Sequence, residues 1–254
     1  MKTLFLHGFT GSSASWEQFI AQNGLDRSQI LTPDLPGHGA NLPADIDAYT
    51  MEAAVHDLIT GLDANSSNPS DLYHLYGYSM GGRLALYLAL TYPERFASLT
   101  LESASSGLKT DEERAARRAS DEALADRIEQ NGIAAFVDEW ERLPLWASQQ
   151  STLTEAQRAA LHQQRLHNDA RGLANSLRAM GTGVQPSLWD RLWELKMPVL
   201  LITGKYDTKF GAISHEIQVT MLYVERRVIP NAGHTVHLEQ PQAVGEAWKA
   251  FIGI

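Results

Sequence analysis

One stretch of this sequence restricts its fold more than any other, residues 72–90, which read LYHLYGYSMGGRLALYLAL. An apolar run at Leu72–Tyr76 is followed at once by the pentapeptide G-x-S-x-G and then by a run of good helix formers. A strand can turn this abruptly into a helix only where the neighbouring side chains are small, a condition that Gly77 and Gly81 meet. The stretch therefore predicts a strand, a sharp turn that presents Ser79, and a helix that leads away from it.

Short apolar runs of the same kind recur along the chain and predict further strands. Most of them precede a helix-like segment, as in right-handed β–α–β units, whose buried parallel strands are almost entirely apolar. The predicted strands are Thr3–Leu6, Ile30–Thr32, Leu72–Tyr76, Leu99–Leu101, Val199–Thr203 and Val224–Ile229. We therefore expect an α/β protein in which helices flank a mostly parallel sheet.

The stretch of residues 104–195 differs from the rest because helical spacing dominates it and no strand pattern appears. Its predicted helices are Asp111–Gln130, Ile133–Arg142 and Thr154–Met180, the first two separated by the breaker Asn131-Gly132. An all-helical block inserted between two strands of a parallel sheet indicates a lid. We therefore divide the chain into a core of residues 1–103 and 196–254 and a helical lid of residues 104–195.

The composition of the chain indicates which kinds of binding partner to expect. A formal net charge of −9 argues against nucleic acid and anionic membranes, and no apolar run approaches the ~20 residues of a membrane span. The chain has no cysteine, which excludes disulfides, thiolate metal sites and a cysteine nucleophile. We expect a cytoplasmic protein that acts on a small molecule without metal or cofactor, as a monomer or weak homo-oligomer.

A serine presented at such a turn needs an acid and a histidine, which follow it in that order along the chain. Asp207, in GKYDTKF, comes just after the predicted strand Val199–Thr203. His234, in NAGHTVHLEQP, follows the last predicted strand. The sequence thus favours Ser79, Asp207 and His234 as a catalytic triad.

Three other residues compete for these roles. His237 lies close to His234, but we place it at the start of the closing helix. Asp190 and Glu102 are rival acids, and neither follows the penultimate strand. We therefore expect none of the three to belong to the triad.

The first predicted strand ends in LHGFTGSS, where a turn would direct the backbone N–H of Phe9 at the substrate. Together with the N–H of Met80 it would form an oxyanion hole. We interpret His7 as a structural turn residue whose ring bonds to backbone. His38, in the loop DLPGHG, is likewise interpreted as structural, and no histidine or carboxylate spacing suggests a metal site.

The segments LHGFTG, DLPGHG, GYSMGG, GKYD and AGHTVH together resemble the α/β-hydrolase superfamily over essentially the whole chain. The resemblance implies the α/β-hydrolase fold with an inserted helical lid. The sequence departs from the family in one respect, since it begins at what would be the third strand of that fold. We therefore expect the usual N-terminal antiparallel hairpin to be absent and the sheet to be shorter.

A helix behind a hydrolytic serine would be expected to carry a small or apolar residue where this chain has Arg83. Alone, such an arginine most often forms a surface or interdomain salt bridge. Further segments nevertheless resemble the 2-succinyl-6-hydroxy-2,4-cyclohexadiene-1-carboxylate synthases of menaquinone biosynthesis. They are GYS-x-GGR, the lid helix with E-x-R-A-x-R-x-x-S-D, W-x-x-x-P-x-W-A-S and the late Q-P-x-L.

This second resemblance implies substrate contacts for five residues. Arg83, Arg117 and Arg165 correspond to the family's carboxylate-binding arginines, and Trp140 and Tyr78 to residues of the substrate pocket. Arg114 and Arg118 lie on the same predicted helix as Arg117, and they leave that assignment open.

The resemblance also implies the reaction, which is elimination of pyruvate from a cyclohexene that bears three carboxylates. The forked guanidinium of arginine suits such groups because it binds a carboxylate through two hydrogen bonds. Ser79 would act as a base through His234 and Asp207, without an acyl-enzyme. The alternatives are a serine esterase or carbon–carbon bond hydrolase with the same triad, and a non-catalytic ligand receptor.

Overall fold

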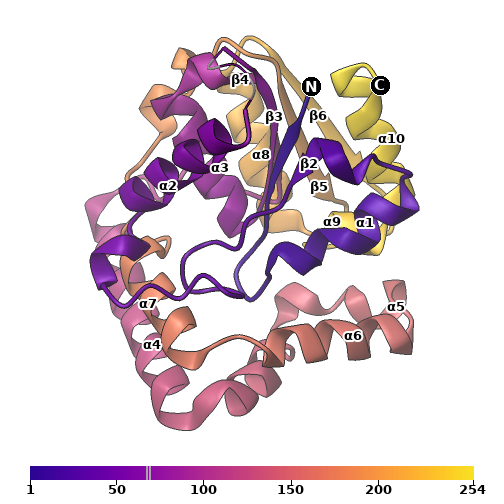
Figure 1. The fold of residues 1–254 in the computed structure, drawn as a ribbon. Helices are drawn as coiled ribbons and strands as arrows, with labels where there is room; N and C mark the ends of the chain where they lie inside the picture. Colours follow the sequence, from indigo (N-terminus) through magenta and orange to yellow (C-terminus); the bar gives the residue numbers. More distant parts are fainter. Residues whose placement is uncertain (67, 69) are drawn as a thin grey trace.

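The computed structural model describes residues 1–66, 68 and 70–254, and a six-stranded sheet forms its centre (Figure 1). The strand order is β2-β1-β3-β4-β5-β6, and every pair of neighbouring strands is parallel. Each strand overlaps one predicted from the sequence, which confirms the expected parallel α/β sheet. The strands are β1 (Thr3–Leu6), β2 (Ile30–Leu31), β3 (Tyr73–Tyr78), β4 (Phe96–Glu102), β5 (Val199–Gly204) and β6 (Val224–Ile229).

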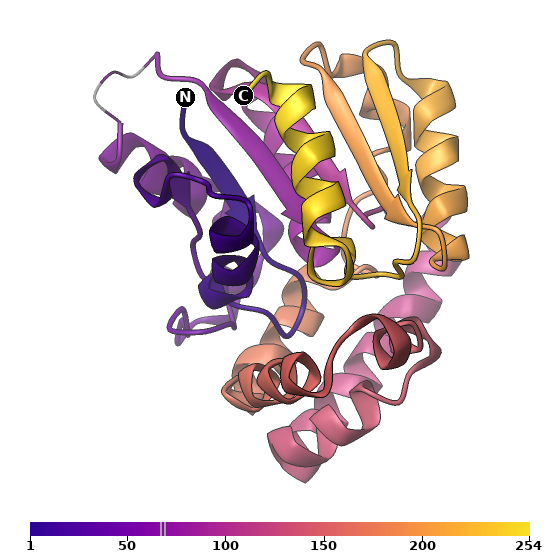
Figure 2. The same cartoon turned by 90° about the vertical axis from the view of Figure 1, so that its right-hand side faces the viewer.

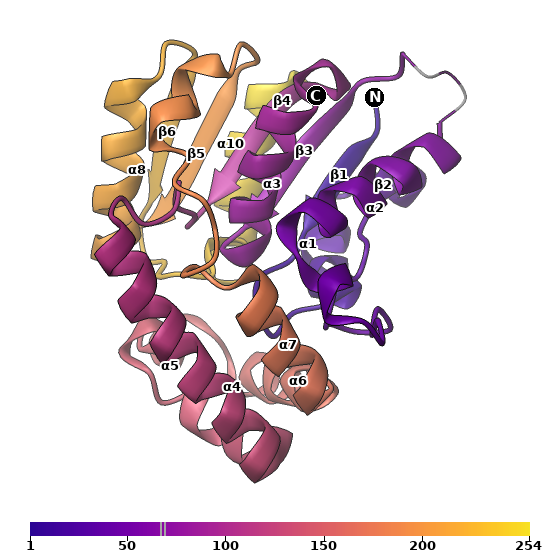
Figure 3. The same cartoon turned by 90° about the vertical axis from the view of Figure 1, so that its left-hand side faces the viewer.

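Helices cover both faces of the sheet. Figure 2 looks onto the face that carries α1 and α10, and Figure 3 looks onto the face that carries α2 and α3. Because both faces are covered, the central strands are buried on both sides, and all six residues of β5 are buried. The helices beside the sheet are α1 (Glu17–Gln22), α2 (Met51–Ala64), α3 (Met80–Thr91), α8 (Thr208–Thr220), α9 (Val236–Glu239) and α10 (Pro241–Ile252).

The core forms two apolar layers because side chains alternate between the faces of each strand. Leu75, Leu99 and Leu201 pack in the layer beneath α3 and are at most 1% exposed. On the other face, Phe5 stacks on Tyr76 with their ring centroids 5.1 Å apart. Burial on this scale stabilises the strands that position the residues at their ends.

The strands β1, β3, β4, β5 and β6 all end at the same edge of the sheet. The pairings that place their carboxyl ends together are Leu6 with Gly77, Tyr78 with Glu102, Glu102 with Ile202, and Gly204 with Ile229. Four helices inserted between β4 and β5 lie across this edge (Figure 1). They are α4 (Asp111–Trp140), α5 (Gln149–Thr152), α6 (Glu155–Leu166) and α7 (Ala170–Met180).

The inserted helices differ from those predicted at several points, and α5 was not predicted. The expected break at Asn131-Gly132 is a kink within α4, where Gly132 has φ 79° and ψ 171°. The helix predicted over Thr154–Met180 is wrong, since α6 ends at Leu166 and α7 begins at Ala170. Asp169 separates them because its carboxylate accepts the N–H of Gly172 at 2.7 Å and caps the new helix. Among the residues described, no helix is both long and apolar enough to cross a membrane.

Candidate active site

Ser79 lies at a strained turn between β3 and α3. Its φ of 51° and ψ of −110° are unusual for a residue with a side chain, and such strain is typical of functional turns. Gly77 and Gly81 permit this turn, because a Cβ on either would lie 2.4 Å from a backbone oxygen. The N–H of Ser79 donates to the carbonyl of Glu102 at 2.9 Å, which anchors the turn to β4.

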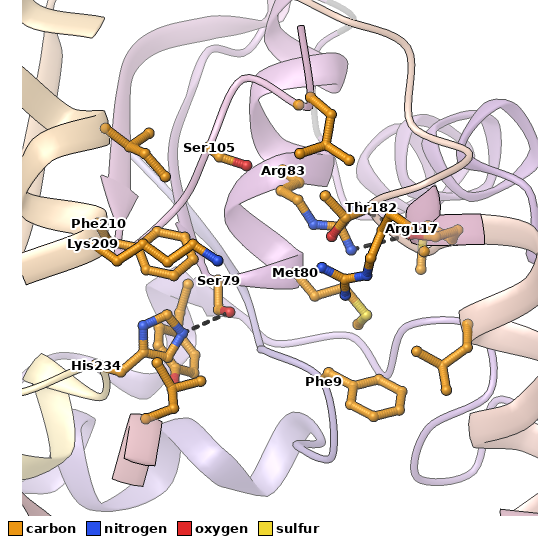
Figure 4. A pocket seen from close by; sticks show the side chains of 18 of the residues that line it. Phe9, Ser79, Met80, Arg83, Ser105, Arg117, Thr182, Lys209, Phe210 and His234 are labelled. Carbon is orange, nitrogen blue, oxygen red and sulfur yellow. Dashed lines mark hydrogen bonds between the residues drawn. The ribbon is translucent and has the colours of Figure 1, made fainter. Parts of the chain in front are cut away.

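A chain of hydrogen bonds joins three of the predicted residues, and Figure 4 shows its first bond, between Ser79 and His234. The Oγ of Ser79 lies 3.0 Å from Nε2 of His234, and Nδ1 of His234 lies 2.6 Å from Oδ2 of Asp207. The other oxygen of Asp207 accepts the N–H of Phe210 at 3.2 Å, at the N-terminus of α8. This geometry allows His234 to take a proton from Ser79 while Asp207 holds its ring in place.

The rival residues occupy other positions. His237 lies in α9 and approaches the Glu102 carboxylate through Nδ1, at 2.9 Å from Oε1. The same carboxylate accepts the hydroxyl of Tyr76 at 2.6 Å, so Glu102 is engaged within the core. Asp190 is exposed in the short helix of residues 189–194. The structure brings none of the three to the Oγ of Ser79.

Aromatic rings surround the His234 imidazole, which is only 2% exposed. The ring centroids of Phe210, Trp146 and Tyr78 lie 4.6, 5.5 and 5.6 Å from its own. Such packing restricts both the rotation of the imidazole and the access of water to it. Neither Phe210 nor Trp146 is among the predicted site residues, although both stand within predicted motifs, GKYDTKF and W-x-x-x-P-x-W-A-S.

Phe9 and Met80 both line the cavity that contains Ser79. Phe9 follows β1, and Met80 is the first residue of α3, where a backbone N–H has no acceptor within its own helix. Two such amides beside Ser79 are suited to binding an oxygen that gains negative charge. The oxyanion hole at these amides stays a prediction.

His7, which precedes this turn, bonds to backbone on both sides of its ring. Its Nδ1 lies 2.9 Å from the carbonyl of Gly8, and its Nε2 accepts the N–H of Leu35 at 3.0 Å. Burial lowers the pKa of His7 to about 4, opposed by the Gly8 hydrogen bond and the charge of Asp34. His7 thus holds the loop in place as a neutral ring.

This neutral histidine should make stability depend on pH. An unfolded histidine has a pKa near 6.5, so below that pH the unfolded chain binds a proton that folded His7 excludes. The stabilisation is fully present above pH 6.5 and is lost as the pH falls towards 4, by up to about 3 kcal/mol. Urea unfolding from pH 7 to pH 4 should show a shallower pH dependence in His7→Gln than in the parent. Equal slopes would refute the assignment.

The cavity that contains Ser79 has a volume of about 740 Å³ and is rich in cations for a chain of net charge −9. Arg83 points into it from α3 (Figure 4). Its guanidinium donates to the carbonyl of Met180 at 3.1 and 3.2 Å and to Oε1 of Gln185 at 3.0 Å. No carboxylate in the described part of the chain forms a salt bridge with it.

Burial is the main effect on this guanidinium, which is 8% exposed as a residue. Loss of water and the nearby charge of Arg117 lower the pKa of Arg83 to about 10, opposed by Asp121. A buried cation without a carboxylate partner costs stability unless an anion binds to it. Arg83 is therefore a candidate site for a substrate anion.

The two other predicted arginines occupy different cavities. Arg117 lines the cavity of Ser79, and its Nε donates to Asp121 at 2.7 Å. Arg165 lies instead in an adjoining cavity of about 280 Å³, where it pairs with Glu141 at 2.8 Å and stacks over Trp146. The structure thus brings Arg83 and Arg117 together and separates Arg165 from them.

The two predicted pocket aromatics line the cavity of Ser79. Trp140 packs against Trp146, with ring centroids 5.7 Å apart. Tyr78 lies on the boundary between the two cavities, and its hydroxyl lies 2.8 Å from Oγ1 of Thr235. These rings supply apolar walls to a cavity in which cationic side chains outnumber carboxylates.

Two lysines that are not among the predicted site residues also line the cavity. Lys109 precedes α4, and its ammonium pairs with Glu216. Lys209 lies in the first turn of α8, two residues after Asp207. The only sequence signal for Lys209 was its place beside the predicted acid in GKYDTKF. Across residues 1–66, 68 and 70–254, no three or more His, Cys, Asp or Glu side chains are grouped so as to hold a metal ion.

Comparisons with known proteins agree with this geometry. The alpha/beta hydrolase family model matches residues 3–247. The 2-succinyl-6-hydroxy-2,4-cyclohexadiene-1-carboxylate synthase of Enterobacter sp. (strain 638) is 35% identical over 95% of this chain and 87% of its own length. A Bacillus subtilis (strain 168) protein that carries the same name provisionally is 45% identical over 97% of this chain and 88% of its own.

Solved structures of two other proteins are also similar to this chain over most of their length. MenH from S. aureus superimposes with a TM-score of 0.92 at 34% identity, covering 100% of this chain and 95% of its own. A thermophilic esterase from Thermogutta terrifontis, determined with malate bound, reaches a TM-score of 0.79 at 26% identity, over 100% of this chain and 89% of its own. The likeness thus extends over nearly the full length of each protein.

Proposed function

The chain belongs to the alpha/beta hydrolase family and, within it, to the 2-succinyl-6-hydroxy-2,4-cyclohexadiene-1-carboxylate synthases, and we propose that Ser79, His234 and Asp207 perform its lyase reaction. The reaction belongs to menaquinone biosynthesis. It eliminates pyruvate from 2-succinyl-5-enolpyruvyl-6-hydroxy-3-cyclohexene-1-carboxylate. The product is 2-succinyl-6-hydroxy-2,4-cyclohexadiene-1-carboxylate.

In this mechanism Ser79 is a base. Its hydroxyl passes its proton to His234, 3.0 Å away, while Ser79 removes the ring proton next to the succinyl ketone. Asp207 stabilises the imidazolium that results. The electrons from the broken C–H bond shift through the ring, and the bond to the enolpyruvyl oxygen breaks. The released enolate takes up a proton and becomes pyruvate.

The oxygen of the succinyl ketone gains negative charge as the ring proton leaves. The backbone N–H groups of Phe9 and Met80 would hold this oxygen beside Ser79. Such donors are already fixed by β1 and α3, so little reorganisation is needed as the charge develops.

One observation carries the proposal, the buried Arg83 guanidinium in the same cavity as Ser79. A serine that cleaves simple esters does not need a desolvated cation beside it, whereas a substrate with three carboxylates does. Arg83 and Arg117 would each bind one carboxylate, with Trp140 and Tyr78 against the apolar parts of the substrate. Arg165, paired with Glu141 in the adjoining cavity, would act on this site through Trp146, the shared wall on which it stacks.

The competing function is a serine hydrolase, because the same hydrogen-bonded residues also suit nucleophilic attack and an esterase shares the fold. We expect pyruvate release from the enolpyruvyl substrate to exceed hydrolysis of a short p-nitrophenyl ester by far. Intact mass spectrometry during turnover should show no covalent adduct on Ser79, and rapid mixing should show no burst of product. An accumulated acyl-enzyme, or ester turnover that rivals pyruvate release, would support the hydrolase instead.

A further inference from the structure

The charges around the cavity of Ser79 are not balanced. Its two carboxylates both have partners, since Glu216 pairs with Lys109 and Glu113 accepts the backbone N–H of Thr110 at 3.0 Å. Among the cations, Lys109 pairs with Glu216 and Arg117 with Asp121, whereas no salt bridge among the described residues engages Arg83 or Lys209. Arg165 belongs to the adjoining cavity. The cavity of Ser79 therefore offers only two arginines to a substrate with three carboxylates.

Lys209 is the remaining cation. It is exposed, and no hydrogen bond or salt bridge within the described part of the chain engages its ammonium. Its nearest recorded partner is the Phe210 ring, whose centroid lies 5.6 Å from Nζ. The first turn of a helix disfavours a cation, because the helix dipole is positive there. A stabilising effect on α8 therefore does not account for a lysine at this position.

Figure 4 places Lys209 across the cavity from the arginines. Lys209 and Phe210 lie on one side of Ser79 together with His234, while Arg83 and Arg117 lie on the other. Phe210 packs on the His234 ring with a centroid distance of 4.6 Å, which fixes the start of α8 beside the proposed base. A carboxylate bound by Lys209 would therefore lie next to the imidazole, away from the carboxylates bound by the arginines.

We propose that Lys209 binds the carboxylate of the enolpyruvyl arm, an inference that rests on the elimination of pyruvate proposed above. When the bond to the ring breaks, its electron pair stays on the enolpyruvyl oxygen. The leaving group then carries both a carboxylate and an enolate. The Lys209 ammonium attracts both charges, and the nearby imidazolium of His234 can return the proton that completes pyruvate.

The test uses Lys209→Ala, Lys209→Arg and Lys205→Ala in the full chain. Lys205 is the matched control, an exposed lysine in the turn between β5 and α8 that does not line the cavity of Ser79. We expect Lys209→Ala to lower kcat/KM for pyruvate release about 10- to 100-fold, a typical effect of losing a hydrogen bond to a charged group. Lys209→Arg should keep most of the activity, and Lys205→Ala should match the parent.

A substrate analogue identifies the carboxylate. With an amide in place of the enolpyruvyl carboxylate, the parent should lose about as much kcat/KM as Lys209→Ala loses with the normal substrate. Lys209→Ala should lose little more on the analogue, because the contact is already absent. A further loss as large as that of the parent would show that Lys209 binds elsewhere and overturn the inference.

The remaining outcomes separate this inference from the proposed function. If the parent releases pyruvate and Lys209→Ala stays within about two-fold of it, Lys209 makes no such contact and the elimination stands. If the parent releases no pyruvate from the enolpyruvyl substrate, both the elimination and the role of Lys209 are refuted. Circular dichroism and the Tm of each variant test whether the substitution leaves the fold intact.

Discussion

Ser79→Ala is expected to lower kcat for pyruvate release by about 10²- to 10⁴-fold, which is the usual contribution of a positioned general base. The variant loses the hydroxyl that would remove the ring proton, while the turn that carries it is fixed by Gly77, Gly81 and the hydrogen bond to Glu102. Its Tm should therefore stay near that of the parent. A coupled assay of pyruvate release measures kcat, and thermal unfolding followed by near-ultraviolet circular dichroism measures Tm.

His234→Ala and Asp207→Asn should each lower kcat by orders of magnitude as well. Residues that act as one unit are not additive, so the triple variant should be little slower than the most damaging single variant. His215→Ala is the control, because this exposed histidine lies on α8 outside the cavity. Full activity in Ser79→Ala would refute the mechanism and leave His234 as the candidate direct base.

Arg83→Ala is expected to reduce kcat/KM by roughly 30- to several-thousand-fold, with a much smaller effect on Tm. Removing one partner of a desolvated, hydrogen-bonded charge pair typically costs about 2–5 kcal/mol, which converts to that range. The effect on stability is small because the guanidinium binds only neutral groups, on Met180 and Gln185. Arg83→Lys should recover only part of the loss, since lysine lacks the forked geometry.

Arg178→Ala is the matched control for this prediction. Arg178 also belongs to the inserted helices, but it binds three carboxylates of α4, those of Glu122, Asp126 and Glu129. We expect its loss to lower Tm and to leave kcat/KM within a few-fold of the parent. If Arg83→Ala gave that same pattern, Arg83 would be a structural residue, and the main support for a carboxylate-rich substrate would disappear.

The sequence predicted the strands well because buried parallel strands are short, apolar and bounded by turns. The runs at Thr3–Leu6 and Val224–Ile229 match β1 and β6 at both ends. The order of Ser79, Asp207 and His234 could also be predicted, since each follows a different strand and parallel strands end at one edge. For these residues, position along the chain determines position in space.

Other features depend on packing that local sequence does not contain. The split between α6 and α7 required a single capping carboxylate, Asp169, within a run that otherwise has helical spacing. The separation of Arg165 from Arg83 depends on where Trp146 packs between the inserted helices and the sheet. Lys209 gave no signal of its own, because an exposed lysine near a helix start is common and only the fold directs it at the cavity.

The position of the inserted helices between β4 and β5 has a consequence for how the chain folds. The two strands are neighbours in the sheet, yet β4 ends at Glu102 and β5 begins at Val199. Closing a loop of roughly a hundred residues costs about 4 kcal/mol in chain entropy. The inserted helices share an apolar cluster of their own, which includes Phe136 and Leu173, so their early collapse would shorten the effective loop. Because Asp207 and His234 follow β5 and β6, they can reach Ser79 only after this closure, and we expect the active site to form late in folding.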